Sequence, residues 1–459
     1  MHPPLLPQRL LRSCGTALGA AALACALPAQ AAVVGSGTAG SCTEAALNTA
    51  LSGGGVVTFD CGGGPVTITL TTEKVLTAAT NIDGAGLVTL DGNAAVRHFR
   101  LSNAVSYTLA GLSLVNGRTT DDGGAVHVNG ATLLLNKVTL ANNVASGMGT
   151  RGGALFATGG ANVTLSEVKA TGNQAASGGA IYINTNSTLL LNGFIADGNH
   201  ASVEGGALAH RGSALTVQQS LFTANSIDDP QEAGAAIVVA PHVGTSSLAI
   251  ANSTFQGNTS AGGPGGSTLG VAMAPDGTID NSTFAANGSA DAAVHAFFNA
   301  TLTLKNTIVS HTTGGNNCRT SDGGAVVDGG NNLQFGGGTA QSCGASIPVA
   351  DPQLAALADN GGFSRTMALL PGSPAIDAGS GCTATDQRLV ARPIGPACDI
   401  GAYEAPLPTT PGGGGDGDPP SSAAPAPVPA LAPAGLALLA ALAGAAGLGA
   451  LRRRHISGR

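Results

Sequence analysis

One motif recurs through the middle of this sequence and restricts the folds open to it: two glycines, an alanine and a run of apolar residues. The clear copies begin at Gly123, Gly152, Gly178 and Gly205, which are 26 to 29 residues apart. A period of this length is typical of stacked repeats, in which no single repeat buries its apolar face alone. The glycine pairs that we expect to be structural are Gly123 and Gly124, Gly152 and Gly153, Gly178 and Gly179, and Gly205 and Gly206.

An asparagine closes the apolar run in each repeat, and apolar residues alternate with other residues before it. The asparagines that we expect to be structural are Asn143, Asn173, Asn199, Asn225, Asn258 and Asn287. Alternation with a period of two, interrupted by Gly and Asn, is typical of short strands and not of helices. Stacking equivalent strands in parallel, about 4.8 Å apart, merges their apolar faces into one core. The sequence therefore predicts a parallel β-helix.

Both ends of the chain differ from the repeats. Residues 1–31 contain two arginines, an apolar run and a small-x-small site that ends at Ala31, which predicts a signal peptide for the Sec pathway. Residues 431–451 are apolar and long enough to span a bilayer, and Arg452-Arg453-Arg454 follow them. Basic residues after the span predict a cytoplasmic C-terminus and an external location for everything before the span.

These patterns divide the chain into seven segments. They are a signal peptide (1–31), an N-terminal cap (32–55), the β-helix repeats (56–335), an unrepeated module (336–404), a linker rich in Pro, Gly and Ser (405–430), a membrane-spanning helix (431–451) and a basic tail (452–459).

The segment between the two ends is acidic. Six of the 19 basic residues lie outside residues 32–430, whereas all 26 acidic residues lie inside, so this segment has a formal charge of −13. An acidic surface with few aromatic residues is a poor partner for nucleic acid, so we expect none.

The cysteines agree with export. Six remain after the signal peptide, and an oxidising compartment favours disulfides between them. Fifteen pairings are possible. Proximity in sequence favours Cys42 with Cys61, Cys318 with Cys343, and Cys382 with Cys398. The alternative, a zinc site, has little support because no Cys-x-x-Cys spacing occurs.

Several segments resemble known families. Residues from about 331 to 404, including Pro371-Gly372-Ser373-Pro374 and Asp386-Gln387-Arg388, resemble the choice-of-anchor Q domain of secreted bacterial β-helix proteins. Leu389 departs from that pattern, in which Gly is usual. Val428-Pro429-Ala430-Leu431, with the apolar span and the arginines, resembles a degenerate form of the Gram-negative C-terminal sorting signals that begin with Ile-Pro-Thr-Leu or Pro-Glu-Pro.

The repeats also resemble those of chlamydial polymorphic outer-membrane proteins, in Phe222 to Asn225, Phe255 to Asn258 and Phe284 to Asn287. These resemblances imply a pectin-lyase-like fold. We therefore predict an all-β protein: a right-handed parallel β-helix solenoid of roughly ten coils, with a short N-terminal capping helix and a C-terminal transmembrane helix.

Parity within the Gly-Gly-Ala strands identifies candidate binding residues. The residue between the two inward aliphatic positions is expected to point outward, and these residues include His127, Phe156 and Tyr182, which we expect to form an exposed stack of rings. The residues just before the glycine pairs include Asp122, Arg151 and Glu204, and Asp122 and Arg151 are expected to pair. A stabilising role for both sets is the alternative to ligand binding.

Catalytic candidates are few. Asp121 with Asp122, and Asp228 with Asp229, supply pairs of carboxylates of the kind that glycoside hydrolysis requires, but adjacent strand residues point to opposite faces. A pectate-type lyase would need calcium and a base. We expect no cofactor and no resident metal, with calcium as the exception that a lyase would require.

The sequence thus favours an exported, envelope-anchored surface protein with a non-enzymatic structural, adhesive or binding role. The alternative is a calcium-assisted polysaccharide lyase or glycoside hydrolase that acts on an extracellular polysaccharide. The expected partners are the membrane, through the C-terminal helix, and an extracellular polysaccharide or a cell-surface partner. The expected location is the cell envelope, its outer surface or the medium, with anchoring that is at least transient.

Overall fold

The computed structural model describes residues 31–261, 266–274, 276–288, 292–311, 315–337 and 342–407. All of these belong to one compact unit that ends at Leu407. The predicted signal peptide before residue 31, the linker beyond Leu407 and the predicted membrane-spanning helix lie outside the described residues. Within the described ranges, no helix is long and apolar enough to cross a membrane.

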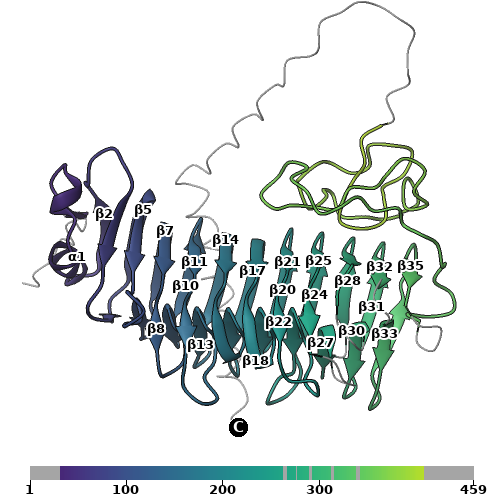
Figure 1. The fold of residues 1–459 in the computed structure, drawn as a ribbon, viewed down its shortest axis with the longest axis horizontal. Helices are drawn as coiled ribbons and strands as arrows, with labels where there is room; N and C mark the ends of the chain where they lie inside the picture. The colour runs from purple at the N-terminus through teal and green to yellow at the C-terminus, as the bar shows by residue number, and fades with distance from the viewer. Residues whose placement is uncertain are drawn as a thin grey trace, which may run out of the picture. The chain divides into compact units, whose positions relative to one another are not determined.

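The chain winds into a parallel β-solenoid of about 11 turns, which confirms the predicted fold class and slightly exceeds the expected number of coils (Figure 1). Three parallel sheets run along it. The ten-stranded sheet consists of β4 (Lys74–Leu76), β6 (Phe99–Leu101), β9 (Val126–Asn129), β13 (Leu155–Thr158), β16 (Ile181–Ile183), β19 (Leu208–His210), β23 (Ile237–Val239), β27 (Ser267–Ala272), β30 (Ala292–Phe297) and β33 (Asn316–Thr320). The six-stranded sheet consists of β8 (Arg118–Thr119), β12 (Val144–Ala145), β15 (Gln174–Ser177), β18 (His200–Glu204), β22 (Ser226–Ile227) and β26 (Thr259–Ser260).

The third sheet has 19 strands. It consists of β1 (Ala32–Val34), β2 (Gly55–Phe59), β3 (Val66–Thr69), β5 (Thr80–Asp91), β7 (Ser106–Val115), β10 (Thr132–Asn136), β11 (Thr139–Ala141), β14 (Asn162–Thr171), β17 (Thr188–Asp197), β20 (Ala214–Gln218), β21 (Leu221–Thr223), β24 (Ser247–Ala251), β25 (Thr254–Gln256), β28 (Gly277–Asp280), β29 (Thr283–Ala285), β31 (Thr301–Lys305), β32 (Ile308–His311), β34 (Ala325–Asp328) and β35 (Leu333–Gly336).

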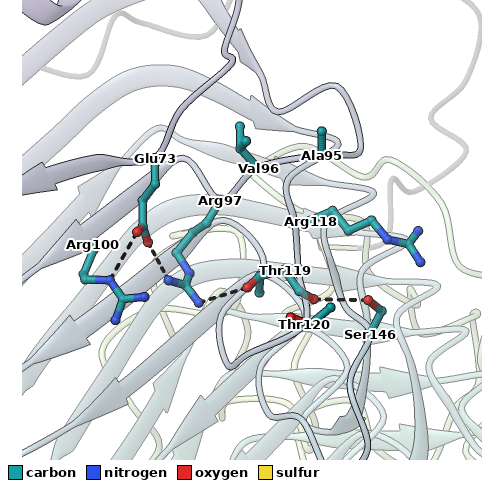
Figure 2. Close-up of a pocket in the computed structure, with 9 residues that line it drawn as sticks. All are labelled: Glu73, Ala95, Val96, Arg97, Arg100, Arg118, Thr119, Thr120 and Ser146. Carbon is teal, nitrogen blue, oxygen red and sulfur yellow. Dashed lines mark hydrogen bonds and ion pairs between the residues drawn. The ribbon is translucent and has the colours of Figure 1, made fainter.

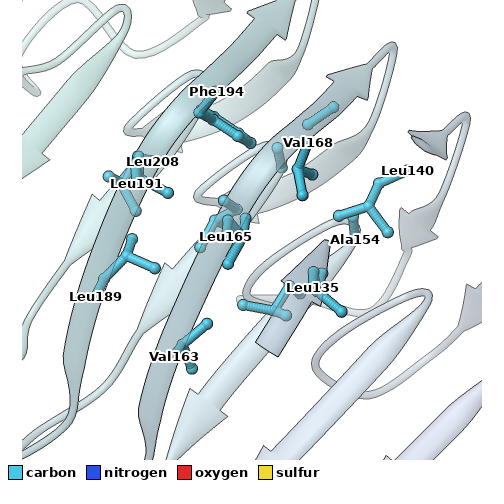
Figure 3. Close-up of a cluster of buried hydrophobic side chains, with 14 of the residues drawn as sticks. Leu135, Leu140, Ala154, Val163, Leu165, Val168, Leu189, Leu191, Phe194 and Leu208 are labelled. Atoms are coloured by element: carbon cyan, nitrogen blue, oxygen red, sulfur yellow. The ribbon is translucent and has the colours of Figure 1, made fainter. Parts of the chain in front are cut away.

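Each coil contributes aliphatic side chains to one continuous core. Leu133, Val163 and Leu189 occupy equivalent positions on neighbouring strands and are at most 2% exposed. Figure 3 shows Leu135, Leu165 and Leu191 in the next inward row of the same strands. Phenylalanines replace the aliphatic residues further along, and the rings of Phe222, Phe255 and Phe284 stack with centroids 4.4 to 4.9 Å apart. The period-two pattern therefore marks the core correctly.

The asparagines form a buried ladder along the coils. From Asn143 to Asn258, each side-chain Nδ2 donates to Oδ1 of the next asparagine at 2.8 to 3.0 Å, and that same Oδ1 accepts the backbone N–H as well. All six asparagines are fully buried. A buried amide without hydrogen-bond partners costs free energy. Each asparagine, or rung, of the ladder therefore depends on the asparagines of the coils before and after it.

The two glycines of each pair have different roles. The first has a positive φ, between 61° and 75° for Gly123, Gly152, Gly178 and Gly205, which side chains rarely adopt. The second has no room for a side chain: a Cβ on Gly153 would lie 2.1 Å from the carbonyl oxygen of Gly179 in the next coil. The pair thus combines a left-handed turn with close backbone contact between coils.

The N-terminal end is closed by a 3-10 turn, η1 (Ala39–Ser41), and a helix, α1 (Glu44–Leu51), as the sequence predicted. Thr43 caps the helix, because its hydroxyl accepts the backbone N–H of Ala46. Glu44 then joins the helix to the first coils through an ion pair with Lys74 and hydrogen bonds from Thr71 and Thr72.

Residues 342–407 have little regular secondary structure and pack against the 19-stranded sheet. Three asparagines in left-handed turns, Asn252, Asn281 and Asn306, one per coil, bind this segment. Thr383 donates to the side chains of Asn252 and Asn281, and the backbone N–H of Ser380 donates to Asn306 Oδ1 at 3.1 Å.

A buried ionic network organises this C-terminal module. Arg392 and Glu404 pair at 2.9 Å with side chains that are each 1% exposed, and Arg388 pairs with Asp386 at 2.6 Å. The Arg388 guanidinium also lies 3.7 Å from the ring centroid of Tyr403. Leu389 has a φ of 70°, a conformation that favours glycine.

The six cysteines form three disulfides: Cys42–Cys61, Cys318–Cys343 and Cys382–Cys398. These are the nearest-neighbour pairs that the sequence spacing favoured. One closes the N-terminal cap, one joins the last coil to the connection that follows, and one lies within the C-terminal module.

Replacing Asn225 by alanine should lower the free energy of unfolding by about 3 kcal/mol, because the rungs on both sides lose buried hydrogen-bond partners. Urea unfolding followed by circular dichroism measures this change. Asn192 lies exposed on β17, so Asn192→Ala is the control and should cost under about 0.5 kcal/mol. Equal losses in the two variants would contradict the ladder's role.

The cap should be sensitive to acid through Glu44. Burial alone raises the pKa of Glu44, but Lys74 and the hydroxyl and backbone N–H of Thr71 outweigh it, so the pKa falls from 4.5 to about 2. A lowered folded-state pKa means that this stabilisation is complete above pH 4.5 and is lost as the pH falls toward 2. Thermal unfolding between pH 6 and pH 2.5 should therefore show a shallower decline for Glu44→Gln than for the native protein.

Asp60 is an exposed carboxylate next to the cap, and Asp60→Asn provides the comparison, which should follow the native curve. If Glu44→Gln has the same pH dependence as the native protein, the carboxylate is not a determinant of the acid sensitivity of the cap.

Candidate functional site

The outward face of the ten-stranded sheet gathers most of the candidate binding residues. Strand register aligns Arg100 with His127, His127 with Phe156, and Phe156 with Tyr182 in one outward row. Ala209 and Val238 continue this row on β19 and β23. The inward neighbours, such as Val126 and Val128, are fully buried, so the parity assigned from sequence holds.

The rings stack, but the expectation that they are exposed is wrong. The His127 and Phe156 centroids are 5.1 Å apart in an edge arrangement, and those of Phe156 and Tyr182 are 5.8 Å apart in a stacked one. Phe156 and Tyr182 are each only 3% exposed. Arg151 covers them, with its guanidinium carbon 4.8 Å and 5.4 Å from the two centroids. Sequence parity could not reveal this cover, because Arg151 belongs to the loop before β13.

Asp122 holds Arg151 over the rings. Asp122 Oδ2 accepts from Arg151 Nη2 at 2.6 Å, and Asp122 Oδ1 accepts the Arg151 backbone N–H at 2.8 Å. This is the ladder pair that the sequence predicted. The same row continues through Ser177 to Glu204, which is 7% exposed and pairs with Arg211. Within this row, the pair of Asp122 and Arg151 covers the stacked rings of Phe156 and Tyr182.

Beyond His127, three arginines line a pocket of about 470 Å³, here called the basic pocket (Figure 2). Its polar side chains are Glu73, Arg97, Arg100, Arg118, Thr119, Thr120 and Ser146. Arg97 lies at the base, with a side chain that is 3% exposed, and donates to the carbonyl oxygens of Gly123 and Asp122 at 2.8 Å each. These carbonyls belong to the first glycine motif, so the repeat positions this arginine.

Two carboxylates lie beside the arginines of the basic pocket. Glu73 bridges Arg97 and Arg100, as Figure 2 shows. Asp121 Oδ2 lies 3.4 Å from Arg97 and 3.7 Å from Arg100, and its side chain is 58% exposed. Burial would raise the pKa of Asp121, but the Asp122 backbone N–H and the Arg97 guanidinium reverse this effect and lower it. Asp121 is therefore ionised at neutral pH.

Arg118 differs from the other two arginines. It lies on β8 and its side chain forms no ion pair within the described part of the chain. Arg118 is exposed and thus offers a free guanidinium in the lining of the pocket, to which Thr119 and Ser146 also belong. Burial, followed by the charges of Arg97 and Arg100, lowers the pKa of His127 nearby, so that ring is neutral at pH 7.

Sequence reasoning missed Glu73, Arg97, Arg100 and Arg118. None belongs to a glycine pair, because the coils of β4 and β6 precede the first motif. A signal was nevertheless present: three arginines fall between residues 97 and 118 of a chain with only 19 basic residues in total.

The structure does not bring the two predicted aspartate pairs together. Asp228 follows β22 and Asp121 follows β8, which are four strands apart in the six-stranded sheet, or roughly 19 Å at normal strand spacing. Asp228 is 66% exposed and lies 3.1 Å from His200 Nε2, while Asp229 accepts the backbone N–H of Gln231. Among the described residues, no three His, Cys, Asp or Glu side chains form a group that could hold a metal ion.

Comparisons with known proteins add little to this geometry. No protein-family model matches the chain, and no curated protein matches it. One solved structure that aligns with it is the crystal structure of pectate lyase Pel9A, with 14% sequence identity, a TM-score of 0.36, and coverage of 79% of this chain and 90% of that chain.

Replacing Arg151 by alanine should lower the free energy of unfolding by about 2 kcal/mol, because Asp122 loses its partner and the rings lose their cover. Arg151→Lys keeps the charge but not the planar contact, so its free energy of unfolding should lie between those of the native protein and Arg151→Ala. Urea unfolding measures both variants. Lys137, in an exposed pair with Glu167, is the control, and Lys137→Ala should cost under about 0.5 kcal/mol.

Proposed function

We propose that this protein is an exported, envelope-anchored β-helix that binds a partner at the outward face of its ten-stranded sheet, in a structural or adhesive role without chemical conversion. The partner is an extracellular polysaccharide or another cell-surface molecule that presents an anionic group to the basic pocket. Three disulfides support an oxidising location outside the cytoplasm. The signal peptide and the membrane-spanning helix remain predictions from sequence.

One observation supports binding over catalysis most directly: arginines already engage two of the predicted catalytic carboxylates. Arg151 contacts both oxygens of Asp122, and Arg97 and Arg100 lie beside Asp121. A carboxylate held in an ion pair is a weaker proton acceptor. These groups therefore suit a rigid, charged surface better than general-base chemistry.

The basic pocket supports an anionic partner. Although residues 32–430 have a formal charge of −13, three arginines and one carboxylate, Glu73, line this pocket, and Asp121 lies beside two of the arginines. Guanidinium groups bind carboxylate and phosphate oxygens in a planar, two-point arrangement. Arg118 is the cation with no intramolecular partner in the described chain, so it is the group that we expect to contact the ligand.

A second candidate function is a polysaccharide lyase or glycoside hydrolase. Glu73 lines the basic pocket and pairs with Arg97 and Arg100, and Asp121 lies beside the same two arginines, so two carboxylates share two cations. Two carboxylates are the minimum for glycoside hydrolysis. A lyase would need a base and a cation that neutralises the substrate's carboxylate.

One experiment separates the two functions. The full-length protein is incubated with oligomers of galacturonate and alginate and with a neutral oligosaccharide, with and without calcium, and both binding and chain length are measured. We expect binding of an acidic oligomer without cleavage, weakened about tenfold by Arg118→Ala, which corresponds to about 1.4 kcal/mol. Lys137→Ala, which removes an exposed cation elsewhere, should leave binding unchanged.

Cleavage that is lost in Glu73→Gln or Asp121→Asn would instead establish the enzyme. Equal binding of the neutral oligosaccharide would contradict the anionic partner. Surface proteolysis of intact cells, with and without residues 431–451, tests the location: loss of these residues should release the protein into the medium.

A further inference from the structure

We propose that a second pocket on the same outward face binds a primary ammonium group on an alkyl chain, such as the lysine side chain of a partner polypeptide. This pocket, here called the amine pocket, is lined by Glu204, Arg211, Glu232, His242, Phe297 and Phe298 together with apolar residues. It shares no residue with the basic pocket, so the proposal does not depend on the function proposed above.

The walls of the amine pocket suit a hydrocarbon chain. Its volume is about 340 Å³, and Val238, Pro241 and Met273 contribute apolar surface. Phe297 and Phe298 lie at its rim with centroids 5.4 Å apart, and Phe298 is 52% exposed. Methylene groups pack against such walls, while the faces of aromatic rings attract an ammonium group.

The charged groups leave one carboxylate unpaired. Arg211 pairs with Glu204 and also donates to the carbonyl oxygen of Ala240 at 2.7 Å, so its guanidinium is already engaged. Glu232 forms no ion pair within the described residues. The amine pocket therefore has two carboxylates and one arginine.

His242 does not change the balance of charges in the amine pocket. His242 Nε2 lies 3.3 Å from the Tyr182 hydroxyl. Burial, followed by the charge of Arg211, lowers the pKa of His242, so the ring is neutral at pH 7. Its ring adds a polar edge to the amine pocket but no positive charge.

The electrostatics at Glu232 favour a cation. Burial raises the pKa of Glu232, and the neighbouring carboxylates of Glu204 and Asp229 raise it further, with Arg211 opposing them. Neighbouring carboxylates that raise the pKa of Glu232 produce a local negative potential that a bound cation would offset.

An alkylammonium ion fits these features better than a metal ion. Calcium takes six to eight oxygen ligands, whereas the amine pocket has two carboxylates and one of them is paired with Arg211. The apolar walls and the two phenylalanines would contribute nothing to a metal ion but would contact an alkyl chain. We therefore infer that Phe297 and Phe298 contact the alkyl chain of the ligand and that Glu232 binds its ammonium group.

The experiment uses the full-length protein and two small probes, Nα-acetyl-lysine methylamide and its neutral counterpart, Nα-acetyl-norleucine methylamide. Binding is followed by ligand-observed NMR. We expect the lysine probe to bind and the norleucine probe to bind at least about fivefold more weakly, because it has the alkyl chain without the charge. Glu232→Gln and Phe298→Ala should each weaken the lysine probe by a similar factor.

Asp228→Asn is the matched control, because it removes one negative charge from the same segment outside the amine pocket and should leave binding unchanged. Circular dichroism checks that every variant keeps the native fold. Equal binding of the two probes, equal loss in Asp228→Asn, or displacement of the lysine probe by millimolar calcium would overturn the proposal. None of these outcomes bears on acidic oligosaccharides or Arg118.

Discussion

Coil-to-coil hydrogen bonding in strict register is the constraint on which the rest of this structure depends. Each coil binds the next through its strands and through the buried asparagines, whose amides pair only when the rungs align. A shift of one residue would turn every apolar side chain outward and leave those amides unsatisfied. Because the register is fixed, the outward side chains of successive coils also align, and they form rows on the surface in which neighbouring side chains contact one another.

This alignment explains why charged residues cover the outward face of the ten-stranded sheet. Asp122 and Arg151 occupy the same position in successive coils, so opposite charges become neighbours and pair, while Glu204 lies two coils beyond Arg151 and pairs with Arg211. Pairing over Phe156 and Tyr182 removes both rings from water and fixes the centre of the face. The basic pocket and the amine pocket lie on either side of this covered centre.

The C-terminal module shows a different use of the same regularity. Beneath it, the turns between strands have asparagines at Asn252, Asn281 and Asn306, whose amides bind the module's backbone and hydroxyl groups. Equivalent turns in earlier coils have Lys137 and Glu167, which pair on the surface. The change from charged residues to asparagine in these turns is visible in the sequence. Its role follows only from the tertiary structure, in which the C-terminal module packs against the asparagine turns.

The sequence alone determined the parallel solenoid, its capping helix, the parity of its strands, the pairing of Asp122 with Arg151 and the nearest-neighbour disulfides. All of these follow from local period or short separation along the chain, which a linear pattern records. Only the tertiary structure decided that Phe156 and Tyr182 are covered, that Glu73 meets Arg97 and Arg100, and that Glu232 lies in the amine pocket. Those contacts join loops from different coils, and their geometry depends on loop conformations that no repeat encodes. The Gly-Gly-Ala motif thus fixes the scaffold through backbone space and turn geometry, while the non-repeating residues around it form the pockets.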